Sequence, residues 1–103
     1  MNKDLVNEIW DIIDRIPEKT IATDFDSHYV TKDLVRTNNR EYLLYVGDSQ
    51  GQSKYARHGH IARKIGKHPR VVKRSKISNS LSENTNNNDS YCAGWRKVSK
   101  QKS

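Results

Sequence analysis

The sequence predicts a small domain that is mostly α-helical and ends in a β-hairpin, an α+β fold. Apolar residues before Pro69 recur at helical spacing, whereas the two short stretches after it are rich in β-branched and aromatic residues, as strands are. A chain of 103 residues has room for one domain. We expect that domain over residues 1–98, with a polar hairpin loop at about 78–90 and a disordered basic tail over residues 99–103.

The clearest helix is predicted over residues 4–16. Its apolar residues make one stripe at helical spacing: Leu5, Ile9, Ile12, Ile13 and Ile16. Acidic residues crowd its first turns, where the helix dipole favours negative charge, and Pro17 ends it. The stripe indicates a helix that packs on the core. Because Val6 and Trp10 widen the apolar face, a dimer seam is the alternative.

Two further helices are predicted in the middle of the chain. Residues 18–26 form a connector in this interpretation, and a helix follows over residues 27–36 with Asp26 or Ser27 as its N-cap. The next stretch, "REYLLYVGD", is continuously apolar at its centre, and periodicity does not decide there between helix and strand. We favour a helix at 39–47, because an asparagine precedes the run and "GDSQGQ" breaks it.

A fourth helix and a hairpin are predicted in the second half. The stretch "SKYARHGHIARKIGKHP" indicates an amphipathic helix that Gly66 caps and Pro69 stops. Gly59 inside it costs about 1 kcal/mol relative to alanine. The stretches "RVVKRSKIS" and "SYCAGWRKV" predict the two strands of the hairpin, and Trp95 is the residue expected to fold the hairpin back onto the helices.

Positive charge is concentrated in the second half of the chain. Residues 1–26 carry three Lys/Arg and seven Asp/Glu, whereas residues 52–103 carry thirteen Lys/Arg and two Asp/Glu. Such an asymmetry predicts that one end of the molecule faces a polyanion. Lysine and arginine neutralise backbone phosphates with release of counterions, so we expect the polyanion to be a nucleic acid.

The order of three helices, a basic amphipathic helix and a basic hairpin resembles the winged helix–turn–helix class of DNA-binding proteins. The resemblance depends on "ARHGHIARKIGK", "RVVKRSKI" and "YCAGWRKV". It implies that the basic helix enters the major groove of double-stranded DNA and that the hairpin, called the wing, lies along the backbone or the minor groove. The helix at 39–47 departs from the minimal three-helix arrangement of the class. The implied role is a transcriptional regulator or an accessory factor, and the composition is similar to that of phage or mobile-element products.

The side chains expected to contact DNA fall into a helix group and a hairpin group. The helix group is Lys54, Arg57, His60, Arg63, Lys64 and Lys67, and the hairpin group is Arg70, Lys73, Arg74, Lys76, Arg96 and Lys97. Arginine pairs bidentately with guanine edges, so Arg57 or Arg63 suits base contacts. Lys64 and Lys67 suit phosphates better.

Metal binding and catalysis are disfavoured by the spacing of the relevant residues. His58 and His60 are two apart on a helix, so they point in different directions and would not chelate one ion. The acidic residues Asp24, Asp26 and Asp48 stand at no catalytic motif spacing. We expect no metal, no cofactor and no enzymatic activity.

The chain is expected in the cytoplasm, without a membrane partner. Cys92 is the only cysteine, so an intrachain disulfide is excluded and a reducing compartment fits. The N-terminus lacks the apolar stretch of a signal peptide, and no segment approaches the ~18 apolar residues of a membrane span.

The main alternative is an interaction protein that binds and modulates a host protein or a nucleoprotein complex. The acidic helix 4–16, or a tyrosine cluster of Tyr42, Tyr45 and Tyr55, would contact that partner. Homodimerisation fits the DNA-binding interpretation, since many such regulators pair two half-sites. RNA binding is also open, because Tyr91 and Trp95 alternate on one strand. We expect both to face the core, since the domain is short of core residues.

Overall fold

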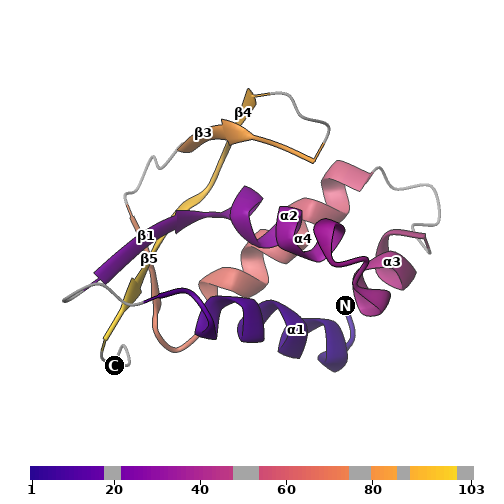
Figure 1. Cartoon of the computed structure of the whole chain (residues 1–103), viewed down its shortest axis with the longest axis horizontal. Coiled ribbons are helices and arrows are strands. Elements are labelled where there is room, and N and C mark those ends of the chain that lie inside the picture. The colour runs from indigo at the N-terminus through magenta and orange to yellow at the C-terminus, as the bar shows by residue number, and fades with distance from the viewer. Residues whose placement is uncertain (18–21, 48–53, 75–79, 86–88, 100–103) are drawn as a thin grey trace.

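A computed structural model of the chain describes residues 1–17, 22–47, 54–74, 80–85 and 89–99. Within these residues, four helices and a three-stranded antiparallel sheet make one α+β unit, and a two-stranded arm projects from the sheet (Figure 1). The predicted mixed class is confirmed. In the described part of the chain, every helix is too short or too polar to cross a lipid bilayer.

Helix α1 (Lys3–Asp14) supplies a large part of the core. The Asn2 side chain caps it by accepting a hydrogen bond from the Leu5 amide at 2.9 Å. The predicted stripe is buried: Leu5, Ile9, Ile12, Ile13 and Ile16. This burial confirms the expectation of a core-facing helix. Each such side chain contributes roughly 1.5–3 kcal/mol to stability when it is buried. The Trp10 indole is half-buried and donates to the Lys64 carbonyl at 3.0 Å, which places this residue of the suggested dimer seam in an intramolecular contact.

Helices α2 (Ser27–Arg36) and α3 (Arg40–Gly47) both begin at a side-chain cap. The Asp26 carboxylate accepts a hydrogen bond from a first-turn amide of α2 at 2.9 Å. The Asn39 side chain accepts one from the Tyr42 amide at 3.1 Å. The apolar run in the middle of the chain is therefore a helix, as favoured from its flanking residues, and Tyr42 anchors it in the core.

Helix α4 (Lys54–Gly66) packs on α1 and α2 through Ile61 and Ile65, both fully buried. Gly66 is the last helical residue, and a Cβ there would lie 2.9 Å from the Trp95 ring. The glycine is therefore needed for close ring packing, rather than for the left-handed cap expected from its position. The burial of Trp95 confirms that this residue folds the C-terminal strand onto the helices.

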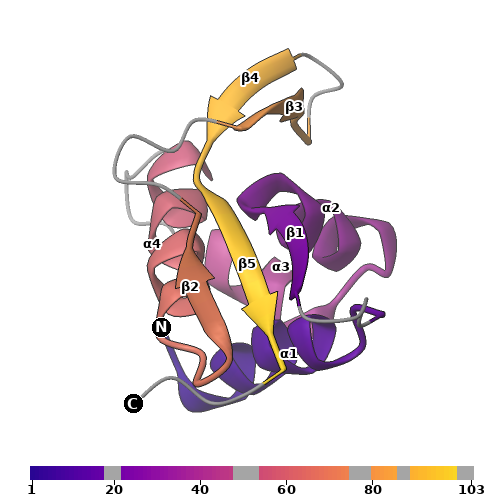
Figure 2. The ribbon, with the colours of Figure 1, turned by 90° about the vertical axis from the view of Figure 1, so that its left-hand side faces the viewer.

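The sheet has the order β1 (Ala22–Asp26), β5 (Gly94–Val98), β2 (Val71–Lys73), and both pairings are antiparallel. The helices cover one of its faces (Figure 2). Strand β1 corrects the interpretation of that stretch as a connector. Its strand signal is weak because Phe25 is its one large apolar residue, and its partner Trp95 lies at the other end of the chain.

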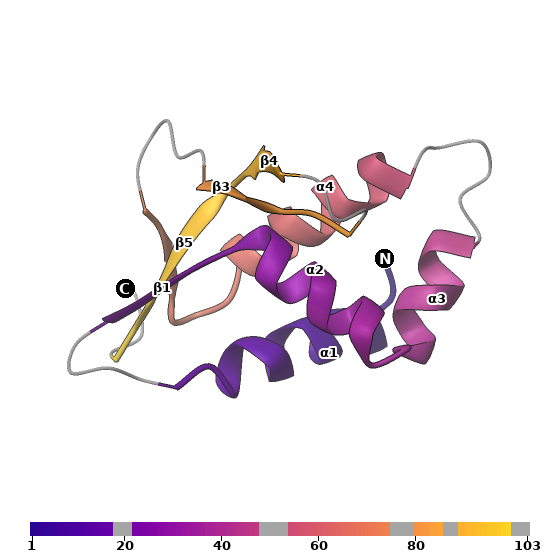
Figure 3. The same ribbon diagram turned by 45° about the horizontal axis from the view of Figure 1, so that its top comes forward.

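The arm consists of β3 (Ser80–Glu83) and β4 (Asp89–Cys92), which pair with each other. In the sequence, both strands lie between β2 and β5. The arm lies over α2 (Figure 3). The predicted antiparallel pairing of the two basic strands is confirmed. The polar loop expected at about 78–90 is wrong over the paired residues. Its remaining positions and most of the tail expected at 99–103 lie outside the described residues.

Candidate nucleic-acid interface

The outward side of α4 carries one stripe of exposed residues. Its members are Ala56, Gly59, Arg63 and, one position beyond the helix end, Lys67. Residues three or four apart on a helix lie above one another, so these four form a continuous line, which we call the α4 stripe. The first half of this line is small and the second half is basic. The buried Ile61 and Ile65 lie on the opposite side of the helix.

Lys73 extends the basic half of the α4 stripe to the edge of the sheet. It pairs in register with Trp95, whose ring packs on Gly66 of α4, so Lys73 belongs to the helical side of edge strand β2. Arg74 is also exposed, but its guanidinium lies over the opposite face, where a Cβ on Gly94 would be 2.8 Å from Nη2. The two cations therefore flank the sheet edge from different sides.

The exposed cations of this region keep their charge available for an external anion. Among the ion pairs of the described residues, none involves Arg63, Lys67 or Lys73. The sequence places no acidic residue between Asp48 and Glu83. The α4 stripe and Lys73 thus form an electropositive strip along α4 that reaches the end of β2.

Helix α3 covers one flank of the α4 stripe. The Tyr45 hydroxyl and His60 Nδ1 lie 3.0 Å apart, and the Arg57 guanidinium lies 4.6 Å from the centre of the Tyr45 ring. Both predicted contact residues are half-buried and fixed beside the stripe rather than extended from it. Sequence reasoning missed this role of Tyr45. His58 lies on the core side, with Nε2 2.7 Å from the Tyr42 hydroxyl, so it is a histidine at the edge of the core.

The outer face of the sheet is less basic than the sequence predicted. Arg96 makes two contacts with its cross-strand partner Asp24, at 2.7 and 3.3 Å, and this ion pair raises the pKa of Arg96. The Arg70 side chain donates from Nε to the Val98 carbonyl at 3.0 Å. Both cations are thus engaged within the molecule.

Lys97 lies inside the protein, contrary to the prediction that it contacts DNA. It is 2% exposed, and its Nζ donates to the carbonyls of Asp14 and Ile16, each at 3.0 Å. Burial and the nearby Arg70 charge lower the pKa of Lys97. The alternation of side chains along β5 turns Lys97 to the inner face next to the end of α1, where helix carbonyls need external donors.

Of the predicted contact residues, Lys64, Lys54 and Lys76 remain to be placed. Lys64 is half-buried and flanks the α4 stripe, with its carbonyl bound by Trp10. The side chain of Lys54 and the whole of Lys76 lie outside the described residues. The predicted set is thus brought together around Arg63, Lys67 and Lys73, and the remaining described members flank them or lie elsewhere.

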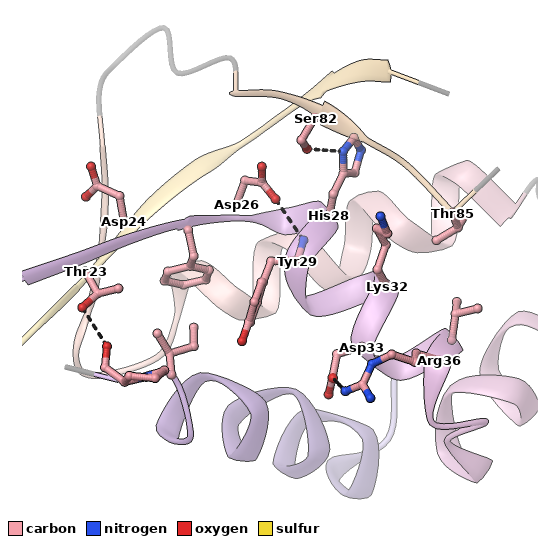
Figure 4. Close-up of a pocket in the computed structure, with 14 residues that line it drawn as sticks. Thr23, Asp24, Asp26, His28, Tyr29, Lys32, Asp33, Arg36, Ser82 and Thr85 are labelled. Atoms are coloured by element: carbon pink, nitrogen blue, oxygen red, sulfur yellow. Dashed lines mark hydrogen bonds and ion pairs between the residues drawn. The ribbon is translucent and has the colours of Figure 1, made fainter. Parts of the chain in front are cut away.

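Away from the α4 stripe, an open groove of about 840 Å³ lies between β1, α2 and the arm (Figure 4). Its carboxylates hold the fold together. Asp26 caps α2, Asp24 binds Arg96, and Asp33 binds Arg36. Within the described segments, no group of three His, Cys, Asp or Glu residues could hold a metal ion. Asp48, considered for catalysis, lies outside these segments.

The aromatic residues proposed for partner contacts take different positions. Tyr42 belongs to the core, and the side chain of Tyr55 lies outside the described residues. Tyr91 is 67% exposed, so the expectation that it faces the core is wrong. Its strand neighbours Ser90 and Cys92 occupy the side of the arm that faces α2, and alternation turns Tyr91 outward. Comparison with known proteins gives no match to a family model, a curated protein or a solved structure.

Proposed function

We propose that this protein binds double-stranded DNA by presenting the α4 stripe to the major groove, as a transcriptional regulator or an accessory factor. The observation that carries the proposal is the stripe itself, a small half followed by a basic half on the open side of a helix. Helix α4 has 13 residues, which corresponds to a length of about 20 Å. The major groove of B-DNA, about 12 Å wide, admits an α-helix side-on.

Gly59 supports a close approach of the α4 backbone to a partner. A Cβ at this position would meet no atom of the described residues within 4 Å, so packing within the described structure does not require a glycine there. Glycine inside a helix costs about 1 kcal/mol relative to alanine. Close contact with DNA would explain a glycine at this position in spite of that cost, because glycine lets the helix backbone come near a ligand.

The exposed cations take separate roles in this proposal. Arg63 suits the bidentate contact to guanine, whereas Lys67 and Lys73 suit phosphates on the groove walls. Arg57 and His60, held by Tyr45, lie at the flank of the helix that meets the other strand of DNA. Phosphate contacts of this kind position the protein, and the arginine supplies base readout.

The resemblance to the winged helix–turn–helix class is part of the same proposal. It is supported by a basic helix that leads into an edge strand, a hairpin and a returning strand. Two features depart from the minimal pattern. Helix α3 is additional, and the arm bends over α2, where Ser82 contacts His28. The wing contacts are therefore assigned to the base of the hairpin at Lys73 rather than to its tip.

Duplex binding followed by fluorescence anisotropy tests the proposal. The double variant Arg63→Ala/Lys67→Ala should bind at least about tenfold more weakly than wild type, because one base contact and one phosphate contact are lost. The matched control Lys3→Ala/Arg15→Ala removes the same net charge from exposed positions of the first helix region and should bind like wild type. Equal weakening in both variants would show that net charge alone attracts the DNA. Competition with random-sequence duplex then separates specific from non-specific binding.

A further inference from the structure

The arm carries an apolar pair on the face that points away from the body. On the covered face, the His28 ring lies 2.8 Å from the Ser82 hydroxyl and 3.5 Å from the Ser90 hydroxyl. Leu81 and Tyr91 are cross-strand partners at the alternate positions, and they are 59% and 67% exposed. The arm thus has polar residues turned inward and apolar residues turned to solvent, the reverse of the usual pattern of a half-buried hairpin.

The apolar pair lies next to an acidic position. Two register positions further along the arm, beyond Ser82 and Ser90, Glu83 pairs with Asp89, and these are the two acidic residues of the basic half of the chain. Two acidic residues paired in the arm add negative charge to it, so the charge pattern disfavours DNA as the occupant of this face. It favours a surface that combines apolar side chains with a cation.

Helix α3 presents such a surface on its outer side. Its exposed residues, Arg40, Leu43, Leu44 and Gly47, follow the helical spacing of three and four and form one line. Leu43 is 49% and Leu44 57% exposed. A Cβ on Gly47 would meet no described atom within 4 Å, so a partner can approach the helix backbone there. We call this line the α3 stripe.

We infer that the arm of one copy of this protein docks on the α3 stripe of a second copy. Leu81 and Tyr91 cover Leu43 and Leu44, which removes apolar surface of both copies from water. Arg40 at the start of the stripe meets the acidic pair of the arm. The outer face of the arm and the α3 stripe match in both hydrophobicity and charge. The apolar side chains of each are exposed in the described structure. The docking does not require DNA, so it is testable in its absence.

Sedimentation velocity of the full chain over a range of concentrations tests the docking. The arm variant Leu81→Ser/Tyr91→Ser and the α3 variant Leu43→Gln/Leu44→Gln should each self-associate at least about tenfold more weakly than wild type, because each loses one apolar half of the contact. An equimolar mixture of the two variants should associate, since each supplies the face that the other lacks. Tyr29→Ser, at an apolar side chain that is 50% exposed but outside both stripes, is the matched control and should associate like wild type.

Charge reversal gives a second measurement that does not remove apolar side chains. Arg40→Glu should weaken self-association, and adding Glu83→Lys and Asp89→Lys to the same chain should restore it. A wild-type chain that stays monomeric at all concentrations overturns the docking. So does a mixture of the arm and α3 variants that stays monomeric, and so does loss of association in the α3 variant alone, which would indicate that α3 pairs with α3. Circular dichroism checks that each variant is folded.

Discussion

From the inner face of the sheet, Lys97 donates hydrogen bonds to backbone carbonyls at the end of α1. The last carbonyls of a helix have no intrahelical donor, and a buried carbonyl without a partner is costly. The Lys97 ammonium donates to the carbonyl of Asp14, the last residue of α1, and to the carbonyl of Ile16, two residues beyond the helix. Its neighbour Arg96 points the other way and binds Asp24. Two adjacent cations on one strand therefore serve the fold on opposite faces of the sheet.

Replacing Lys97 with methionine should lower the free energy of unfolding by about 1–3 kcal/mol. The substitution keeps much of the side-chain volume but leaves the carbonyls of Asp14 and Ile16 without their donor. Urea unfolding measures the loss. Lys73→Met, at an exposed position of β2, should change the stability by less than about 0.5 kcal/mol. Similar losses in the two variants would contradict the assigned role of Lys97.

The difference in stability between wild type and Lys97→Met should depend on pH with a defined sign. Burial lowers the pKa of Lys97 in the folded state below its ordinary value near 10.5. Between these two values the unfolded chain binds more protons than the folded one, so this residue makes stability rise with pH across that window. The stability of wild type relative to Lys97→Met should therefore increase as pH approaches 10.5. A decrease over that range would show that the folded protein favours the charged form.

At the scale of the elements, the sequence predicts the helices better than the sheet. The helices follow from local signals, namely apolar periodicity and caps such as Asp26 and Asn39. Strand β1 and strand β3 of the arm were not predicted, because their stability depends on partners that the local sequence does not reveal. Strand β1 pairs with β5 from the other end of the chain, and the serine-rich arm is held through His28 of α2.

The arm, through its contact with α2 of the same chain, should protect Cys92 from alkylation. Burial raises the pKa of the Cys92 thiol, so the reactive thiolate is scarcer at neutral pH than in an exposed cysteine. Iodoacetamide at about pH 8 should therefore react at least about tenfold more slowly with the folded chain than with the urea-unfolded chain. His28→Ala should speed the reaction of the folded chain, because the arm loses its contacts with Ser82 and Ser90.

Two results would refute this account of the arm. One is equal alkylation rates for the folded and unfolded chains, which would show that the arm does not shield the thiol. The other is an unchanged rate in His28→Ala. Thr37→Ala, at an exposed position just after α2 and remote from the arm contacts described above, is the control for general loosening of α2. It should leave the rate unchanged.

At the scale of the whole molecule, the sequence predicts the candidate site in part. The basic side of α4 follows from periodicity, and Arg63 and Lys67 are exposed as predicted. The hairpin cations divide between surface and interior because strand register decides which face each occupies. That register depends on β1, which the sequence did not reveal. Within the described residues, the fold thus exposes Arg63, Lys67 and Lys73 as a basic strip along α4 that reaches the end of β2.

The salt dependence of duplex binding tests the central claim, that the α4 stripe binds DNA. Each neutralised phosphate contributes about 0.9 to the slope of log affinity against log salt concentration. Wild type should give a steep negative slope, and Arg63→Ala/Lys67→Ala should make it shallower by about one to two, according to whether Arg63 touches a base or a phosphate. The control Lys3→Ala/Arg15→Ala should keep the wild-type slope. A flat slope for wild type, or equal slopes for wild type and the Arg63→Ala/Lys67→Ala variant, would contradict DNA binding through the α4 stripe.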